Sequence, residues 1–177
     1  MIGDHVSGEG SNLQALLDRR LPVSAVASSR PGVRALERAA RAGVPQAAFV
    51  LEEQESRAAR DAAMANWLEA HGVELVVCAG YMHLLTTAYL DRFPGRIVNV
   101  HPSLLPAFPG ARPIADALEA GVETTGVTVH VVDEGLDTGP VLRQEPLPIE
   151  PRETLVARIH AVEHRLLPEV VGELCAR

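Results

Sequence analysis

Aromatic residues are scarce in this chain of 177 residues, where they make up 3% of the sequence, and cysteine occurs only twice. With so few aromatic rings, the hydrophobic core has to be built from Val, Leu, Ala and Ile. Cys78 lies within an apolar run, whereas Cys175 lies near the C-terminus. We therefore expect two reduced thiols rather than a disulfide.

The sequence also lacks a hydrophobic run of membrane-spanning length, an N-terminal secretion signal and an excess of positive charge. We therefore expect a cytoplasmic protein with no membrane partner. The net charge of −7 argues against nucleic acid as the main partner, although a local basic pocket stays compatible with it. The hydrophobic content of 47% argues against disorder, and the length predicts a single domain over residues 1–177.

Apolar strand-like runs alternate along the chain with helix-like segments, which predicts an α/β fold. We expect an open, mostly parallel twisted sheet with helices on both faces. The region 125–149 contains no helix, so an antiparallel addition is expected there. Strands are expected at Met1–Val6, Val23–Ala27, Val44–Val50, Val73–Ala79, Arg96–Val100, Thr125–Val132 and Pro140–Ile149. Helices are expected at Leu13–Arg19, Val33–Ala42, Glu53–His71, Leu84–Arg92, Ile114–Ala120 and Thr154–Cys175.

The first expected strand contains two polar residues, Asp4 and His5. A central buried strand should not carry such groups without partners, because burying an unpaired polar group costs free energy. Either the strand is short, or these side chains have partners elsewhere in the sequence.

A glycine-rich turn leads from this strand into the first expected helix. The glycines allow close approach of the backbone to a ligand, and Ser11 and Asn12 can cap the helix and donate hydrogen bonds beside its free N–H groups. A helix N-terminus favours anions, so phosphate is the natural ligand, although a plain capped helix fits the same pattern. Glu9 adds a negative charge here and would have to point away.

The segment 98–113 turns abruptly from an apolar strand into a loop with four prolines. Asn99 and His101 lie where the strand meets the loop. Prolines restrict the motion of the loop by fixing φ, so this place suits an amide donor and a titratable imidazole that must be held still. Ser103 lacks the glycine-flanked setting of a nucleophilic serine, which argues against a serine hydrolase.

A second polar loop, Asp133–Gly139, follows the strand that ends near His130. If it meets His101 at the carboxyl edge of the sheet, one of its carboxylates can favour the imidazolium. An imidazolium and an amide can together stabilise an oxyanion, which is the chemistry of acyl transfer to an amine without a covalent nucleophile. The loop also fits a solvated turn or a cation site, and His130 fits a buried structural residue equally well.

These segments resemble the formyltransferases that use 10-formyltetrahydrofolate, over nearly the whole chain. Ser7–Gln14 resembles the family's phosphate loop, and Asn99–Pro106 resembles its catalytic segment. Asp133–Pro140 resembles its Asp-containing loop. The strand end around Met82 resembles its folate pocket, and Glu163-His164 resembles the pair on its closing helix. Within the family, the match is best to the branch that formylates glycinamide ribonucleotide in purine synthesis.

The resemblance implies a Rossmann-like formyltransferase fold, 10-formyltetrahydrofolate as co-substrate, no metal, and a monomer or homodimer. It implies that the amine attacks the formyl carbon while three groups stabilise the oxyanion and relay the proton: Asn99, His101 and Asp137. It assigns acceptor binding to Gly10, Ser11, Asn12, His160 and Glu163. It assigns folate binding to Arg57, Met82, His83, Leu84, Leu85, Asn99, Asp133, Glu134, Gly135, Leu136 and Asp137.

Three alternatives share this chemistry or this fold. A catalytic domain of the methionyl-tRNA formyltransferase type would need a basic surface or a second domain, and the acidic chain shows neither. A deformylase would transfer the formyl group to water. A folate- or nucleotide-binding protein without activity would have no need of the residues Asn99, His101 and Asp137.

Overall fold

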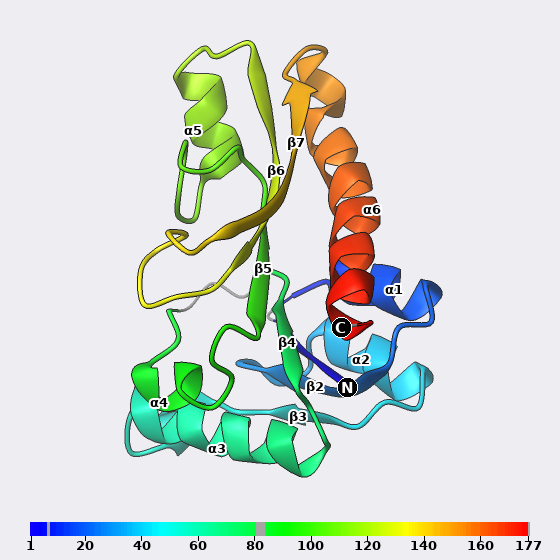
Figure 1. Cartoon of the computed structure of the whole chain (residues 1–177), viewed down its shortest axis with the longest axis vertical. Helices are drawn as coiled ribbons and strands as arrows, with labels where there is room; N and C mark the ends of the chain where they lie inside the picture. The colour runs from blue at the N-terminus through cyan, green and yellow to red at the C-terminus, as the bar shows by residue number, and fades with distance from the viewer. Residues whose placement is uncertain (7, 81–83, 177) are drawn as a thin grey trace.

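The structure is a computed structural model, and it describes residues 1–6, 8–80 and 84–176. Within this part of the chain, strands form one sheet in the order β3-β2-β1-β4-β5-β6-β7 (Figure 1). The strands are β1 Ile2–Val6, β2 Val23–Ser28, β3 Gln46–Ala48, β4 Leu75–Cys78, β5 Ile97–His101, β6 Thr124–Val131 and β7 Val141–Pro148.

The sheet is parallel from β3 to β5, and the last two strands are antiparallel. The expected parallel sheet with an antiparallel addition in the region 125–149 is therefore confirmed. The addition consists of both β6 and β7, which the loop 132–140 joins as a hairpin because no helix lies between them.

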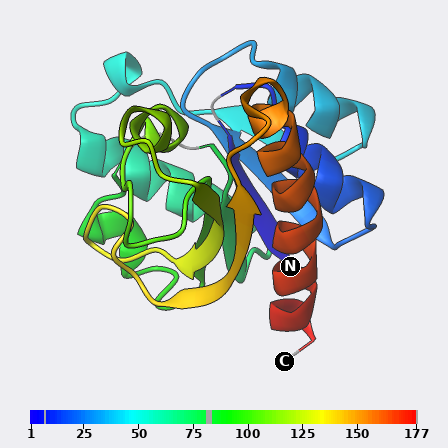
Figure 2. The same ribbon diagram turned by 90° about the horizontal axis from the view of Figure 1, so that it is seen from above.

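Helices cover both faces of the sheet, as expected. They are α1 Ser11–Asp18, α2 Arg34–Arg41, α3 Arg57–Ala70, α4 Thr87–Leu90, α5 Pro113–Glu119 and α6 Leu155–Cys175, with short 3₁₀ turns at Leu51–Glu53 and Arg152–Thr154. Helices α1, α2 and α6 lie on one side of the parallel strands, and α3 and α4 lie on the other (Figure 2).

Aliphatic side chains fill the core on each face, as the scarcity of aromatics predicts. One cluster joins Leu16 of α1 to Ile159 and Leu166 of α6, over Val77 and Val98 of the sheet. On the opposite face, a second cluster packs α3 against β2 and β4. The long helix α6 and the strands thereby hold α1 firmly against the sheet.

Helices α1, α3 and α4 begin two or more residues away from the positions that the sequence patterns predict, and α4 begins at Thr87 rather than Leu84. Helix α1 begins at Ser11 rather than Leu13, because Gly10 adopts a left-handed conformation (φ 68°) and turns the chain directly into the helix. Helix α3 begins at Arg57 rather than Glu53, because the hydroxyl of Ser56 accepts a hydrogen bond from the N–H of Ala59 and caps the helix there.

The polar first strand is a full strand with both polar side chains buried. His5 Nε2 lies 2.7 Å from the hydroxyl of Tyr89 in α4, so His5 has a partner that the sequence did not reveal. The carboxyl oxygens of Asp4 have no hydrogen-bond partner among the described residues. Burial raises the pKa of Asp4 well above its usual value, and the nearby backbone N–H of His5 opposes this rise without offsetting it.

No helix among the residues described is long and apolar enough to cross a membrane.

Candidate active site

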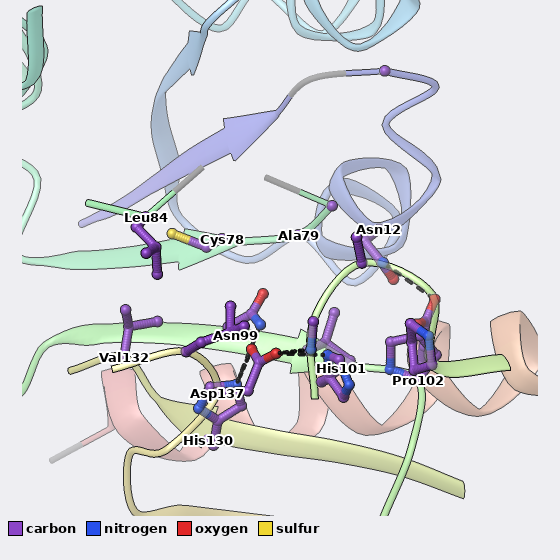
Figure 3. Close-up of a pocket in the computed structure, with 18 of the residues that line it drawn as sticks. Asn12, Cys78, Ala79, Leu84, Asn99, His101, Pro102, His130, Val132 and Asp137 are labelled. Carbon is purple, nitrogen blue, oxygen red and sulfur yellow. Dashed lines mark hydrogen bonds and ion pairs between the residues drawn. The ribbon is translucent and has the colours of Figure 1, made fainter. Parts of the chain in front are cut away.

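A cavity of about 590 Å³ opens at the carboxyl edge of the sheet. It lies beside β1, β4 and β5, where the strand order reverses and where open α/β sheets bind their ligands. Three polar groups from separate parts of the chain meet in it (Figure 3): the α1 tip, the end of β5 and the loop after β6. Its lining includes Gly8 to Asn12, Cys78 to Gly80, Leu84, Leu85, Asn99 to Pro102, His130, Asp133, Gly135 to Asp137, His160 and Glu163.

Asp137 lies between two imidazole rings in this cavity (Figure 3). Its Oδ2 is 3.5 Å from His101 Nδ1, and its Oδ1 is 3.6 Å from His130 Nε2. The N–H of Gly110 donates a hydrogen bond of 2.8 Å to Oδ2. The structure thus brings the loop after β6 against the end of β5 and the proline loop that follows it.

The ring of His101 is oriented by the backbone. Its Nε2 lies 2.9 Å from the carbonyl oxygen of Phe108, and because a carbonyl can only accept, Nε2 must donate. A second proton on His101 therefore resides on Nδ1, which faces Asp137. At 3.5 Å this N–H is not fully engaged by the carboxylate, so it can share a hydrogen bond with an oxygen of a ligand.

The amide of Asn99 is held by His130. His130 Nδ1 lies 2.9 Å from the carbonyl of Val131 and so must donate to it, which leaves Nε2 of the neutral ring as an acceptor. Asn99 Nδ2 lies 3.2 Å from that atom and donates to it. The second N–H of the Asn99 amide remains available to the cavity.

Asp137 is ionised throughout the neutral range. Burial acts to raise its pKa, but a hydrogen bond from the His130 ring in its protonated form, the N–H of Gly110 and the charge of His101 together outweigh burial. The net result is a pKa of Asp137 below its usual value. A carboxylate that keeps its charge can stabilise an imidazolium beside it.

Backbone strain accompanies this geometry. Phe108 and Asp137 both have φ of 55°, in the left-handed region that residues other than glycine rarely adopt. Phe108 supplies the carbonyl that orients His101, and Asp137 supplies the carboxylate. Gly139 lets the loop return close to β6, since a Cβ there would lie 1.9 Å from the carbonyl oxygen of Val131.

The far end of the cavity pairs α1 with α6. Asn12 Nδ2 donates to Glu163 Oε2 at 3.4 Å, and Asn12 Oδ1 has no partner among the residues described. Burial raises the pKa of Glu163 to about 7, and the hydrogen bond from Asn12 opposes this only weakly. The two side chains therefore offer both an acceptor and a titratable carboxyl to a ligand.

The glycine-rich turn lies at the same end. Gly10 and Ser11 line the cavity, but the cap of α1 differs from the expectation: the capping residue is Gly10, and no side chain bonds the first turn. The free N–H groups at the helix tip are therefore open to a ligand. The carboxylate of Glu9 pairs with Arg34 at 2.8 Å, away from the helix tip, as the phosphate hypothesis requires.

The residues that the resemblance assigns to folate fall into three groups. Leu84, Leu85, Asp133, Gly135 and Leu136 line the cavity with Asn99 and Asp137. Arg57 and Glu134 are exposed and do not line it, because Arg57 begins α3 on the outer surface and Glu134 points outward from its loop. Met82 and His83 lie outside the described residues, so their assignment stays a prediction.

Sequence reasoning missed two contributors to the cluster around Asp137, the carbonyl of Phe108 and the N–H of Gly110, and it left open the role of a third, the ring of His130. The first two are backbone groups and leave no mark in the sequence. His130 was left open between a structural and a site role, and its register opposite Asn99 in the β5–β6 pair decides its location.

No group of three or more His, Cys, Asp or Glu side chains that could hold a metal ion occurs within the described ranges.

This fold and site define a class of protein that comparison with known sequences identifies. The chain belongs to the formyl transferase family, whose model matches residues 5–171. Its curated relatives include phosphoribosylglycinamide formyltransferases. That of Bacillus subtilis (strain 168) is 41% identical over 177 residues, covering 95% of this chain and 91% of the relative. That of Mycobacterium tuberculosis (strain ATCC 25618 / H37Rv) is 47% identical over 176 residues, covering 95% and 81%.

Solved structures agree with this membership. The phosphoribosylglycinamide formyltransferase of Bacillus halodurans superimposes with a TM-score of 0.95 at 38% identity, over 99% of this chain and 95% of that one. The glycinamide ribonucleotide transformylase 1 of Symbiobacterium toebii gives a TM-score of 0.92 at 47% identity, over 96% and 84%.

Proposed function

We propose that this chain, as a single catalytic domain over residues 1–177, transfers the formyl group of 10-formyltetrahydrofolate to the amine of glycinamide ribonucleotide. One observation carries the proposal: a single cavity joins an amide, an imidazole and a carboxylate to an open helix tip. The relatives that bear this activity in their names are 41–47% identical to the chain over most of its length.

The reaction begins when the amine of the acceptor attacks the formyl carbon. A new bond forms between the amine nitrogen and that carbon, and the carbonyl electron pair moves onto oxygen. The free N–H of Asn99 and the Nδ1–H of protonated His101 donate to this oxyanion. Donors positioned in advance stabilise the transition state more than the substrate, so they lower the barrier.

Asp137 serves two roles in this scheme. Its charge stabilises the imidazolium of His101, which is the state that can donate from Nδ1. As the intermediate collapses, the bond between the formyl carbon and the folate nitrogen breaks. The proton lost by the attacking amine passes through Asp137, or a water beside it, to that folate nitrogen, so charge and atoms balance.

The two substrates occupy opposite ends of the cavity. The phosphate of the acceptor binds the free N–H groups of the α1 tip at Gly10 and Ser11. Asn12 and Glu163 bind polar groups of the acceptor between this tip and the amine. The folate lies against Leu84, Leu85 and the loop Asp133–Asp137, where apolar and backbone groups line the wall.

A direct test compares acceptors. The purified chain is supplied with 10-formyltetrahydrofolate and, in separate reactions, glycinamide ribonucleotide, charged initiator tRNA or water alone, and folate product is followed. Formyl transfer to the ribonucleotide at least about a hundredfold faster than to either other acceptor is expected, since a built site rejects acceptors that leave its polar groups unpaired. Equal or faster transfer to tRNA or water would overturn the assignment.

A further inference from the structure

Helix α2 fastens the turn before α1 by contacts that the proposed chemistry does not use. The N–H of Ala35 donates to the carbonyl of Gly8 at 3.1 Å, and Arg38 Nε donates to the carbonyl of Glu9 at 2.8 Å. Arg38 Nη1 also donates to the side chain of Gln14 in α1 at 3.0 Å. One half-buried guanidinium therefore joins the turn to the helix that follows it.

These contacts determine where the turn's own N–H groups point. In a trans peptide the carbonyl and the following N–H point in opposite directions, and the peptides after Gly8 and Glu9 are both trans. Because α2 holds both carbonyls, the N–H groups of Glu9 and Gly10 face away from α2. The cavity lies on that side, since it is lined by residues 8–12 and by α6 but not by α2.

Helix α2 packs closely against the turn before α1. A Cβ on Gly10 would lie 2.6 Å from the Cβ of Ala35, and Gly10 has φ of 68°. Successive N–H groups in such a turn form a concave anion site. A second feature points to a ligand here: Asn12, only 9% exposed, lines the same end of the cavity and keeps an unpartnered Oδ1 among the described residues.

We infer that Arg38 is a positioning residue for the acceptor's phosphate, acting through the carbonyl of Glu9 rather than by contact with the substrate. It keeps the N–H groups of Glu9 and Gly10 turned toward the cavity, where they add to the donors of the α1 tip. The inference rests on the proposed function for the identity of the acceptor. The anion-binding geometry itself depends only on α2 and the turn.

The test replaces Arg38 and compares two acceptors, glycinamide ribonucleotide and the same compound without its phosphate. Arg38→Met should raise KM for the ribonucleotide about tenfold or more, because hydrogen bonds to a charged group are lost. Its kcat, its KM for the folate and its kcat/KM for the dephosphorylated acceptor should stay within about twofold of wild type. The KM of Arg38→Lys for the ribonucleotide should lie between those of wild type and Arg38→Met, because an ammonium keeps the charge but lacks the forked N–H groups of the guanidinium.

Arg34→Met is the matched control. Arg34 lies on the same helix and pairs with the Glu9 side chain, so this variant removes the same charge but leaves the Glu9 carbonyl held. Its KM for the ribonucleotide should change less than twofold. Each of three results would overturn the inference. They are an unchanged KM for the ribonucleotide in Arg38→Met, an equal rise of this KM in Arg34→Met, and an equal loss of kcat/KM with both acceptors in Arg38→Met.

Binding of inorganic phosphate to the free protein, measured by calorimetry, separates this inference from the proposed function. Arg38→Met should weaken phosphate binding by the same factor as it raises KM. If wild type forms no product with the ribonucleotide, the proposed function fails. The inference then still stands or falls on whether Arg38→Met weakens phosphate binding and Arg34→Met does not.

Discussion

At the scale of single residues, Asp137 connects the two imidazoles of the site. It contacts the N–H of Gly110, lies 3.5 Å from His101 and 3.6 Å from His130, and keeps its charge because these neighbours outweigh its burial. The change Asp137→Asn preserves shape and removes that charge. We expect kcat to fall about 10²–10³-fold, as for loss of one oxyanion-stabilising interaction, with both KM values nearly unchanged.

Steady-state kinetics with both substrates measure this effect. Glu119→Gln is the control, because Glu119 is an exposed carboxylate that pairs with Arg112 and does not line the cavity. A kcat of Asp137→Asn within about threefold of wild type would remove Asp137 from the proposed mechanism.

Glu163 is a carboxyl residue whose pKa is raised into the neutral range. Its pKa is raised from 4.5 to about 7 by burial, so the folded protein holds this proton more tightly than the unfolded chain. The stability that results is fully present below about pH 4.5 and is lost as pH rises to about 7. A shift of this size corresponds to about 3 kcal/mol.

The variant Glu163→Gln should lack the loss of stability that the ionisation of Glu163 causes as pH rises. Urea unfolding of wild type should show a fall in unfolding free energy between pH 5 and 8, and Glu163→Gln should show a fall smaller by about 2–3 kcal/mol. Glu173→Gln, an exposed change on the same helix, is the control and should follow wild type. Parallel curves for wild type and Glu163→Gln would mean that Glu163 titrates normally.

At the scale of elements, α3 supports the pocket wall through one buried ion pair. Arg60 Nε and Nη2 both donate to Asp61 Oδ1, at 2.9 and 2.6 Å, and both residues are fully buried. Asp61 Oδ2 accepts the N–H of Thr86, which precedes α4. The segment that carries Leu84 and Leu85 into the cavity is thereby tied to α3.

Removing the carboxylate from this pair should be costly. Asp61→Asn leaves the guanidinium of Arg60 buried without a counter-charge, and we expect a loss of about 3–5 kcal/mol in unfolding free energy. Glu69 lies on the same helix as Asp61 and forms an exposed pair with Arg92, which follows α4. Breaking this pair by Glu69→Gln should cost less than about 1 kcal/mol. Similar small losses for both variants in urea unfolding would show that the buried pair does not act as described.

Strand β1 carries the converse feature, a buried acid whose carboxyl has no hydrogen-bond partner within the described part of the chain. The carboxyl of Asp4 has a raised pKa, so the stability of the protonated form is present below about pH 4 and is lost as pH rises. Asp4→Val should raise the unfolding free energy by about 1–3 kcal/mol, because an unsatisfied polar group is removed. The gain should be larger at pH 8 than at pH 5. A destabilised Asp4→Val protein at pH 8 would contradict this.

At the scale of the whole molecule, the sequence predicts the order of elements well and the contacts between them poorly. Apolar patterns located the strands within a few residues, because burial on both faces makes a central strand such as β4 a continuous apolar run. Glycines at 43 and 72 ended helices as predicted, both with positive φ. The start of α1 was misplaced by two residues, because capping by a left-handed glycine leaves no side-chain signal.

Contacts remote in sequence depend on register and backbone direction. The pairing of Asn99 with His130 follows from antiparallel alignment of β5 with β6, and nothing local to either residue fixes that alignment. The link between His5 and Tyr89 spans 84 positions. The polar β1 was therefore read as an anomaly, whereas in the fold one of its polar side chains is paired.

The chain contains no lysine, and its sixteen basic residues are all arginines. Two of them hold loops with more than one N–H: Arg158 donates to the carbonyls of Pro148, Ile149 and Pro151, and Arg38 joins the Glu9 carbonyl to the side chain of Gln14 in α1. A guanidinium fork can hold two such groups in fixed geometry, which an ammonium does less well. These guanidinium groups thus fix one turn at the cavity and one loop before α6.

The measurement that bears most directly on the account is the single-turnover rate of formyl transfer, with enzyme in excess over 10-formyltetrahydrofolate and saturating glycinamide ribonucleotide. Wild type should transfer the formyl group rapidly, and His101→Ala should transfer it about 10²–10³-fold more slowly while still binding both substrates. Transfer by His101→Ala at the wild-type rate would show that the imidazole between Asp137 and the Phe108 carbonyl takes no part in the chemistry.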